Sequence, residues 1–367
     1  MTTPNKLDDS LFEAELLTRR EQMYKYLLTS EYRNKLGRGH LLDAFYSYLT
    51  RGGKSLRSAL LLFCCGAVGG DEQKAIPAAA AVEVYHTMSL VHDDIVDKDE
   101  IRRGGPTIHI EFRDRAAREF RFPEEEARHY GVSIALLTGD LLHSLAISIL
   151  CDLHTKIGID PSLVISLVND LTLDVGPTLV EGESLDLQYS NFNIETVGED
   201  AILHMLWQKT GALYQFSGSA GAMIGVNKYD RDMPVVKALS EYSASCGIAF
   251  QLQDDILGLI GKQDELGKPI GSDIREGKRT AIVDFALKRA SEKEKAYLIR
   301  ILGNRRASKE ETDNATELLR QLGGIDHARG LAERHIDNAI KSLQKIPNSR
   351  YRELLYSLSQ YIIQRNF

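Results

Sequence analysis

The sequence predicts an all-α fold, a single helical bundle arranged around a central cavity. Apolar residues recur at helical spacing through most of the 367-residue chain, while alternating strand patterns and short hairpin signals are nearly absent. Paired glycines at 52–53, 69–70, 104–105 and 323–324 mark expected helix ends. No linker composition divides the chain, so we expect one domain over residues 1–367.

The helices differ in how much of their surface is apolar. Segments 132–151 and 211–226 are apolar or small around most of their circumference, which predicts buried central helices. The small residues of 211–225 either allow close helix packing or leave room for a ligand. Asp140 and His143 interrupt 132–151, so we interpret it as a buried helix and expect no transmembrane segment. In chain order, the pattern predicts helices over 9–30, 39–51, 54–68, 73–98, 109–121, 124–152, 161–181, 195–226, 231–261, 279–291, 292–303, 308–322, 325–344 and 348–364.

The composition limits the possible partners and the compartment. The net charge of −7 lacks the broad basic surface of a nucleic-acid-binding protein, so we expect no nucleic-acid partner. Residues 1–10 have no apolar core of a secretory signal. The cysteines show no zinc-site spacing and are expected to be reduced thiols in a cytoplasmic protein; they are Cys64, Cys65, Cys151 and Cys246.

The strongest chemical signal is the acidic segment 92–97. Asp93 and Asp97 are four residues apart, so a helix aims both at the same point, where two like charges need a cation. Clustered aspartates are often a solvated surface, but the apolar segment 87–91 precedes these. Carboxylates without cysteine or histidine partners favour a hard ion such as magnesium, which commonly binds substrate phosphates as well.

A second acidic segment, 250–258, repeats the paired aspartates as Asp254 and Asp255. Metal sites in helical bundles are commonly held by side chains from facing helices. The two segments together therefore predict opposite walls of one magnesium site with several ions.

Basic residues lie in the segments where anionic groups would need them. Guanidinium forks match phosphate oxygens, and lysine supplies a mobile charge. Each basic pair alone is more often a surface feature, but with the aspartates they fit two diphosphate sites. These residues are Lys54, Arg57, Arg102, Arg103, Lys209, Lys268 and Lys278.

These motifs, in this order, resemble those of the trans-isoprenyl diphosphate synthases, also called polyprenyl synthetases. The resemblance covers nearly the whole chain and implies the isoprenoid synthase fold and a homodimer. Besides the two aspartate motifs, the matching segments are Gly53-Lys54-x-x-Arg57, Arg102-Arg103-Gly104-x-Pro106-Thr107, Gly139-Asp140, Gly182-Glu183-x-x-Asp186, Lys209-Thr210-Gly211 and Gly267-Lys268…Ser272-Asp273.

The resemblance also implies a role for each motif residue. Asp93 and Asp97 would bind magnesium from one side and Asp254 from the other, with about three ions per site. Asp94, Asp255 and Asp273 would contact the metal-binding residues without binding metal themselves. Asp94 is nevertheless counted with the catalytic motif. The implied catalytic set is Asp93, Asp94, Asp97, Lys209, Thr210, Gln251, Asp254 and Lys268.

Substrate binding is divided between two sites. Arg102, Lys209 and Lys268 would hold the allylic diphosphate, with Lys278 nearby. Thr210 and Gln251 would line the reacting centre. The isopentenyl diphosphate site would comprise Gly53, Lys54, Arg57, His86 and Arg103. For His86, a hydrogen-bonded core histidine is the alternative.

The implied reaction is the magnesium-dependent head-to-tail condensation of isopentenyl diphosphate with dimethylallyl, geranyl or farnesyl diphosphate. The allylic carbon–oxygen bond ionises, the isopentenyl double bond attacks the cation, and a proton is lost to the departing diphosphate. No protein nucleophile is required.

Product length in this family depends on bulk beneath the first aspartates, here Tyr85, Met88 and Ser89. On a helical wheel Ser89 lies about 40°, Tyr85 about 80° and Met88 about 140° from Asp93. Geranylgeranyl diphosphate is the predicted product, and farnesyl diphosphate or a product of ~C25 or longer is the alternative.

Other functions remain open from the residues alone. They are a class I terpene cyclase, a head-to-head condensing enzyme, a non-catalytic regulatory subunit and a helical metal- or lipid-binding protein. Ser58 and Gly258 depart from common family residues, but neither is a proposed ligand. The charged segment 111–130 is longer than is usual in the family and has no assigned role.

Overall fold

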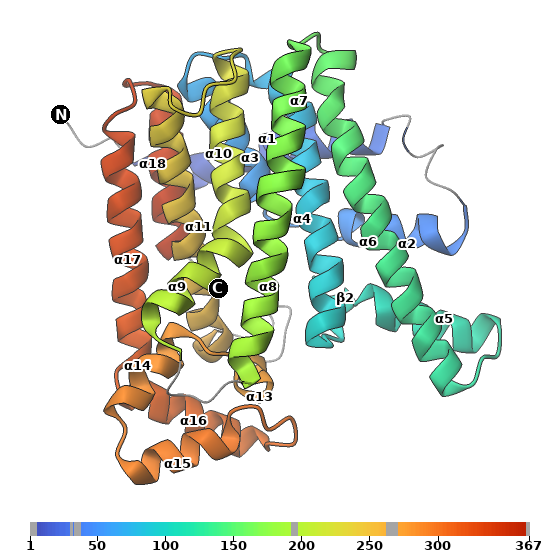
Figure 1. Ribbon diagram of the computed structural model, residues 1–367, viewed down its shortest axis with the longest axis vertical. Coiled ribbons are helices and arrows are strands. Elements are labelled where there is room, and N and C mark those ends of the chain that lie inside the picture. Colours follow the sequence, from blue (N-terminus) through green and yellow to red (C-terminus); the bar gives the residue numbers. More distant parts are fainter. Residues whose placement is uncertain (1–5, 30–31, 33–37, 192–196, 262–270, 365–367) are drawn as a thin grey trace.

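A computed structural model describes residues 6–29, 32, 38–191, 197–261 and 271–364, and it shows a bundle of long helices with a smaller helical layer at one end (Figure 1). The α-helices are α1 (Asp9–Thr29), α2 (His40–Thr50), α3 (Leu56–Ala67), α4 (Ile76–Asp97), α5 (Ile108–Glu119), α6 (Glu124–Thr155), α7 (Pro161–Asn169), α8 (Gly176–Asn191), α9 (Glu199–Leu206), α10 (Ala212–Gly225), α11 (Pro234–Ile260), α13 (Ser272–Glu276), α14 (Ala281–Arg289), α15 (Glu292–Ile301), α16 (Lys309–Gln321), α17 (Gly324–Leu343) and α18 (Arg350–Gln364). The remaining elements are the 3-10 turn η2 (Glu72–Ala75), the strands β1 (Ile101–Arg102) and β2 (Gly105–Pro106), and the π-helical turns η3 (Asp170–Val175) and η4 (Trp207–Gly211).

The all-α prediction is confirmed, and the small residues of α10 serve close packing. A side chain at Gly221 would lie 2.2 Å from the backbone oxygen of Leu61 on α3. One at Gly218 would lie 2.0 Å from the hydroxyl of Ser243 on α11. At these two positions, α10 therefore approaches its neighbours too closely for larger residues.

Several predicted boundaries were wrong. The helix expected over 161–181 extends to Asn191 as α7, η3 and α8, and the helix expected from 195 begins at Glu199. Both contain a π-helical turn, which apolar periodicity does not reveal because the turn shifts the pattern by one residue. The hairpin β1–β2 and the short helix α13 were also missed, since each has too few residues to show a period.

Two helices pass a length and hydropathy test for membrane spans, Glu124–Thr155 and Pro161–Ser190. This is weak evidence, because the core helix of a globular protein passes the same test. Half of the most apolar window of Glu124–Thr155 is buried in the bundle. The interpretation of 132–151 as a bundle helix therefore agrees with the structure.

The buried apolar residues form two clusters. The larger fills the bundle between α1, α3, α4, α6, α10, α11 and α18. The smaller lies beneath α13–α16 and includes Ile256 and Leu259 of α11 and Ile325 of α17. Because α11 and α17 contribute to both clusters, we keep one domain as the prediction. The C-terminal part of α11 contacts α13 near this junction (Figure 1).

Candidate active site

A cavity of about 750 Å³ opens among α3, α4, α8, α10 and α11. One part of its wall is charged and another is apolar, so the cavity can hold an anionic head and a hydrocarbon chain together. The charged wall includes Lys54, Arg57, Asp93, Arg102, Arg103, Glu183, Asp186, Lys209, Asp254, Asp273 and Lys278. The apolar wall includes Tyr85, Met88, Leu179, Val180, Met205 and Leu206.

The last turn of α4 brings the first aspartates together with a carboxylate from α8. Oxygen atoms of Asp93, Asp97 and Glu183 all lie within 4.8 Å of one another. Glu183 comes from the matched segment Gly182-Glu183-x-x-Asp186, to which the sequence assigned no individual role. Burial raises the pKa of Glu183 to about 7, although Lys209 opposes this shift. Three convergent carboxylates suit a hard cation.

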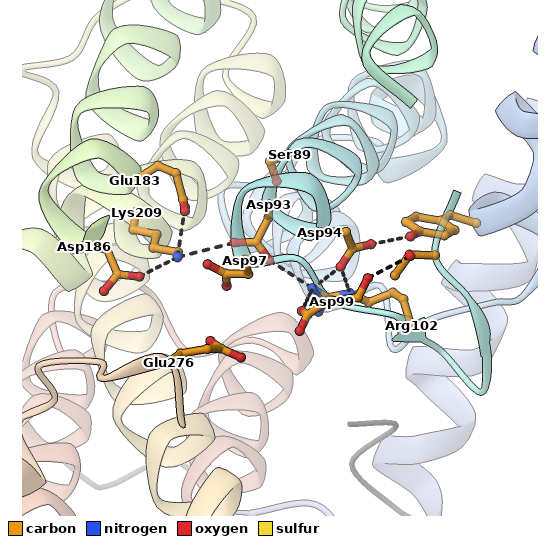
Figure 2. Close-up of polar contacts among 12 residues, drawn as sticks. Ser89, Asp93, Asp94, Asp97, Asp99, Arg102, Glu183, Asp186, Lys209 and Glu276 are labelled. Carbon is orange, nitrogen blue, oxygen red and sulfur yellow. Dashed lines mark hydrogen bonds and ion pairs between the residues drawn. The ribbon is translucent and has the colours of Figure 1, made fainter. Parts of the chain in front are cut away.

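Lys209 joins α4 to α8 (Figure 2). Its ammonium lies 2.7 Å from Asp186, 2.9 Å from Glu183 and 3.3 Å from Asp93. Burial opposes the charge of the lysine, but Asp93 and Asp186 outweigh it and raise the pKa of Lys209 well above its ordinary value. Lys209 and Thr210 lie in the π-helical turn η4, and π-turns often occur at functional sites.

Lys278 has the corresponding place on the other side of the acidic cluster. Its ammonium lies 2.9 Å from Asp97, 3.1 Å from Glu276 and 3.9 Å from Asp273. Burial again opposes the charge, while the surrounding carboxylates, Asp273 first, raise the pKa of Lys278 well above its usual range. Asp97 is buried and does not itself line the cavity.

The hairpin β1–β2 presents two arginines in different directions. Arg102 pairs with Gly105 across the hairpin, and the two residues between them have positive φ, 52° at Arg103 and 71° at Gly104. Positive φ at both central residues defines a type I′ turn, which matches the twist of a hairpin. Arg102 contacts Asp93 at 2.9 Å, Asp94 at 2.5 Å and Asp99 at 3.1 Å (Figure 2).

The second aspartate motif faces this cluster from α11. Asp254 and Asp255 both line the cavity, and the buried Asp255 accepts a hydrogen bond from Gln251 at 3.1 Å. Gln251 in turn accepts a hydrogen bond from the hydroxyl of Thr210 at 2.8 Å. Burial, followed by the charge of Asp273, raises the pKa of Asp255 well above its ordinary value. Thr210 and Gln251 are thus held together at the cavity wall.

A separate cationic region lies where the isopentenyl diphosphate site was predicted. Arg57 is 4.5 Å from the centre of the Tyr214 ring and donates a hydrogen bond to Nε2 of His86 at 3.2 Å. The imidazole must be neutral to accept this bond. Burial, followed by the charge of Arg57, holds the pKa of His86 well below its ordinary value. His86 also lines the cavity.

The predicted floor residues Tyr85, Met88 and Ser89 all line the cavity. Tyr85 is buried, with its ring 5.6 Å from the ring of His143. A side chain at Gly176 of α8 would lie 2.8 Å from the Tyr85 hydroxyl. The floor is therefore built jointly by α4 and the start of α8.

Most predicted site residues meet in one place, while Lys268 lies outside the described residues. Reasoning from sequence missed Tyr48, Asp99 and Glu276, and it gave Glu183 and Asp186 no individual role. The spacing of Glu183 and Asp186 puts both on one helical face, which could have revealed them. Tyr48 lies outside the aspartate and cation motifs.

Comparison with known proteins identifies the family. The polyprenyl synthetase family model matches residues 39–319. The chain belongs to the polyprenyl synthetase family. It is therefore a trans-prenyltransferase with the isoprenoid synthase fold, as the motifs predicted.

Individual polyprenyl synthetases are similar to this chain over nearly its full length. The chain is 38% identical to a geranylgeranyl diphosphate synthase of Saccharolobus solfataricus, over 89% of this chain and 90% of that protein. It is 33% identical to a geranylfarnesyl diphosphate synthase of Aeropyrum pernix, over 89% and 94%. It also resembles the geranylgeranyl pyrophosphate synthase of Corynebacterium glutamicum, solved with isoprenyl diphosphate and magnesium, with a TM-score of 0.83 and 26% identity over 98% of this chain and 100% of that one.

The neutral His86 should make stability depend on pH. Its pKa is lower in the folded protein than the ~6.5 of an unfolded chain, so below that pH the unfolded state binds the extra proton. The free energy of unfolding should therefore fall as the pH drops from about 7 toward 5, by up to ~1.4 kcal/mol per pH unit from this group. Urea denaturation at several pH values would measure the slope.

His86→Gln keeps an acceptor for Arg57 and removes the titration, so its slope should be shallower. His129→Gln, at an exposed position on α6, should keep the native slope. Equal slopes in all three proteins would contradict this account of His86.

Proposed function

We propose that this polyprenyl synthetase condenses isopentenyl diphosphate head-to-tail with an allylic diphosphate, dimethylallyl, geranyl or farnesyl, and makes mainly geranylgeranyl diphosphate. One observation carries the proposal: a single cavity joins two acidic walls and two cationic regions to an apolar floor. Each substrate needs a cationic region for its diphosphate, and the growing chain needs the apolar floor.

The residues present fit magnesium. The carboxylates of Asp93, Asp97 and Glu183 converge within 4.8 Å, and Asp254 lines the same cavity from α11. Oxygen-only donors suit a hard divalent cation. Asp93, Asp97 and Asp254 would hold about three ions, as the family resemblance implies. When bound, the ions would neutralise charge on the departing diphosphate.

Other residues of this chain would bind the allylic substrate and line its reacting carbons. Arg102 and Lys209 would bind the allylic diphosphate beside Asp93, with Lys278 on the far side. Lys268, outside the described residues, keeps the same role on the family resemblance alone. Thr210 and Gln251, already hydrogen-bonded to each other, would line the reacting carbons.

A second cation set would orient the other substrate. Lys54, Arg57, His86 and Arg103 would hold isopentenyl diphosphate so that its double bond faces the allylic carbon. The allylic bond would break, the new carbon–carbon bond would form, and the proton would leave with the diphosphate. Excluding water from the cavity would protect the cation.

Replacing Asp93 or Asp254 by Asn should greatly reduce condensation. Each change removes one carboxylate charge from the site while nearly preserving side-chain volume, and lost electrostatic stabilisation of this kind costs on the order of 10²–10³-fold in kcat. The measurement is incorporation of labelled isopentenyl diphosphate in saturating magnesium. Asp313→Asn on α16, an exposed position, is the matched control. Full activity in both site variants would refute the proposed metal site.

The apolar floor supports a product of about C20. Tyr85 is packed between His143 and Gly176, so it limits the depth available to the chain. The name of the Saccharolobus relative supports geranylgeranyl diphosphate, while that of the Aeropyrum relative supports the longer geranylfarnesyl alternative. Farnesyl diphosphate is less favoured because the small Ser89 lies on the floor nearest Asp93.

Tyr85→Ala and Met88→Ala should each lengthen the product, because either change deepens the cavity. Chromatographic sizing of dephosphorylated products would show a shift by one or more five-carbon units. Tyr356→Ala, on α18 away from the cavity, is a control that should leave the product unchanged. If both floor variants make the native product, this floor does not set the length.

We also propose that the enzyme is a cytoplasmic homodimer. Val180 and Leu187 of α8 are exposed, lie seven residues apart and so form an apolar stripe, and Leu173 is exposed on the preceding turn η3. Leu173 and Val180 are 69% and 70% exposed. A stripe of this kind can pair with the same helix of a second copy around a twofold axis.

Leu173→Glu should convert the protein to a monomer, because it places a charge within the proposed interface. Sedimentation velocity would report the change in mass. Ile299→Glu, at a 48% exposed position on α15, should leave the dimer intact. A monomeric native protein, or a dimeric Leu173→Glu variant, would contradict the proposed interface.

A further inference from the structure

Tyr48 of α2 lies directly beneath the arginine hairpin although it belongs to none of the motifs that suggested the site. It is 1% exposed. Its hydroxyl donates a hydrogen bond to Oδ2 of Asp94 and accepts one from the backbone N–H of Ile108 at 3.3 Å. Its backbone carbonyl accepts a hydrogen bond from Arg103 at 2.9 Å. Tyr48 therefore binds Arg103 directly and binds Asp94, which is a partner of Arg102.

The hydroxyl acts on Arg102 through Asp94. Asp94 is also 1% exposed, so its carboxylate depends on protein donors. Arg102 supplies one donor to Oδ1 at 2.7 Å, and Tyr48 supplies the donor to Oδ2. With both oxygens bonded, the carboxylate is fixed, and it in turn fixes the guanidinium of Arg102 beside Asp93.

The carbonyl acts on Arg103 directly. Arg103 has a φ of 52°, a conformation that is unfavourable for a residue with a side chain, so surrounding contacts must hold it. A side chain at Gly53 would lie 2.7 Å from Nη2 of Arg103, which shows how closely the guanidinium approaches the 52–54 loop. The bond to the Tyr48 carbonyl holds it there.

Residues next to Tyr48, at the end of α2 and just after it, also bind the hairpin and α5. Arg51 donates hydrogen bonds to the carbonyl of Pro106 at 2.5 Å and to Glu111 at 2.8 Å, and Ser47 donates one to Glu111 at 3.0 Å. The C-terminal end of α2 is thus hydrogen-bonded to strand β2 of the hairpin and to the start of α5. Tyr48 lies between Ser47 and Arg51 in the sequence, among these contacts.

Resting on the proposed function, we propose that Tyr48 is a positioning residue that sets Arg102 for the allylic diphosphate through its hydroxyl and Arg103 for isopentenyl diphosphate through its carbonyl. The two arms are separable, because Tyr48→Phe removes the hydroxyl and leaves the carbonyl. The variant should therefore affect one substrate and spare the other.

The experiment compares the full-length native protein with Tyr48→Phe and Tyr26→Phe. Tyr26 donates a hydrogen bond to Asp152 away from the cavity, so its variant loses the same kind of tyrosine–aspartate contact. For each protein we would measure kcat, KM for geranyl diphosphate, KM for isopentenyl diphosphate, the thermal midpoint, and the Kd of inorganic pyrophosphate with magnesium by calorimetry.

Tyr48→Phe should raise KM for geranyl diphosphate and the Kd of pyrophosphate by roughly 10- to 100-fold, the scale of a lost hydrogen bond to a charged group. KM for isopentenyl diphosphate should not change. Tyr26→Phe should lower the thermal midpoint without altering either KM. In an Asp94→Asn background, Tyr48→Phe should have a much smaller effect, because the two residues act in series.

Other outcomes would overturn the inference separately from the proposed function. If the native protein extends geranyl diphosphate but Tyr48→Phe matches Tyr26→Phe, or raises both KM values equally, Tyr48 is merely structural. Full additivity with Asp94→Asn would likewise exclude action through Asp94. If the native protein extends no primer, the proposed function fails, and an unchanged pyrophosphate Kd in Tyr48→Phe would then refute the positioning role.

Discussion

The site depends on cations that hold carboxylates from different helices close together. Asp93, Asp97 and Glu183 would repel one another in a buried setting, and Lys209 and Lys278 lie against them from opposite sides. Removing either lysine would leave buried carboxylates uncompensated, which is strongly destabilising. The same arrangement suits the proposed substrates, because a lysine within reach of a carboxylate proposed to bind metal is also within reach of a diphosphate held there.

Local backbone irregularity gives this cluster its geometry. The type I′ turn sends Arg102 toward the aspartates and lets Arg103 contact α2, while the π-turn η4 carries Lys209 and Thr210. Ser55 and Lys98 also have positive φ and flank the two cationic regions. Strained residues persist only where surrounding contacts hold them, and here the contacts from α2 do so for the hairpin.

The sequence predicted much of the fold and most residues of the candidate site. Helical periodicity located the long helices, and the four-residue spacing of Asp93 and Asp97 predicted their convergence. It could not predict the π-turns or the two-residue strands, because neither leaves a periodic signal. Nor could it find Tyr48, since its role arises from a contact with Asp94 across 46 positions of sequence.

The central claim is that this cavity elongates an allylic diphosphate. The most direct measurement is incubation of the purified protein with magnesium, labelled isopentenyl diphosphate and, separately, dimethylallyl, geranyl or farnesyl diphosphate, followed by sizing of the products. The account predicts linear diphosphates that end mainly at geranylgeranyl diphosphate. Cyclic or head-to-head products, or no extension of any primer by protein that binds magnesium and pyrophosphate, would contradict it.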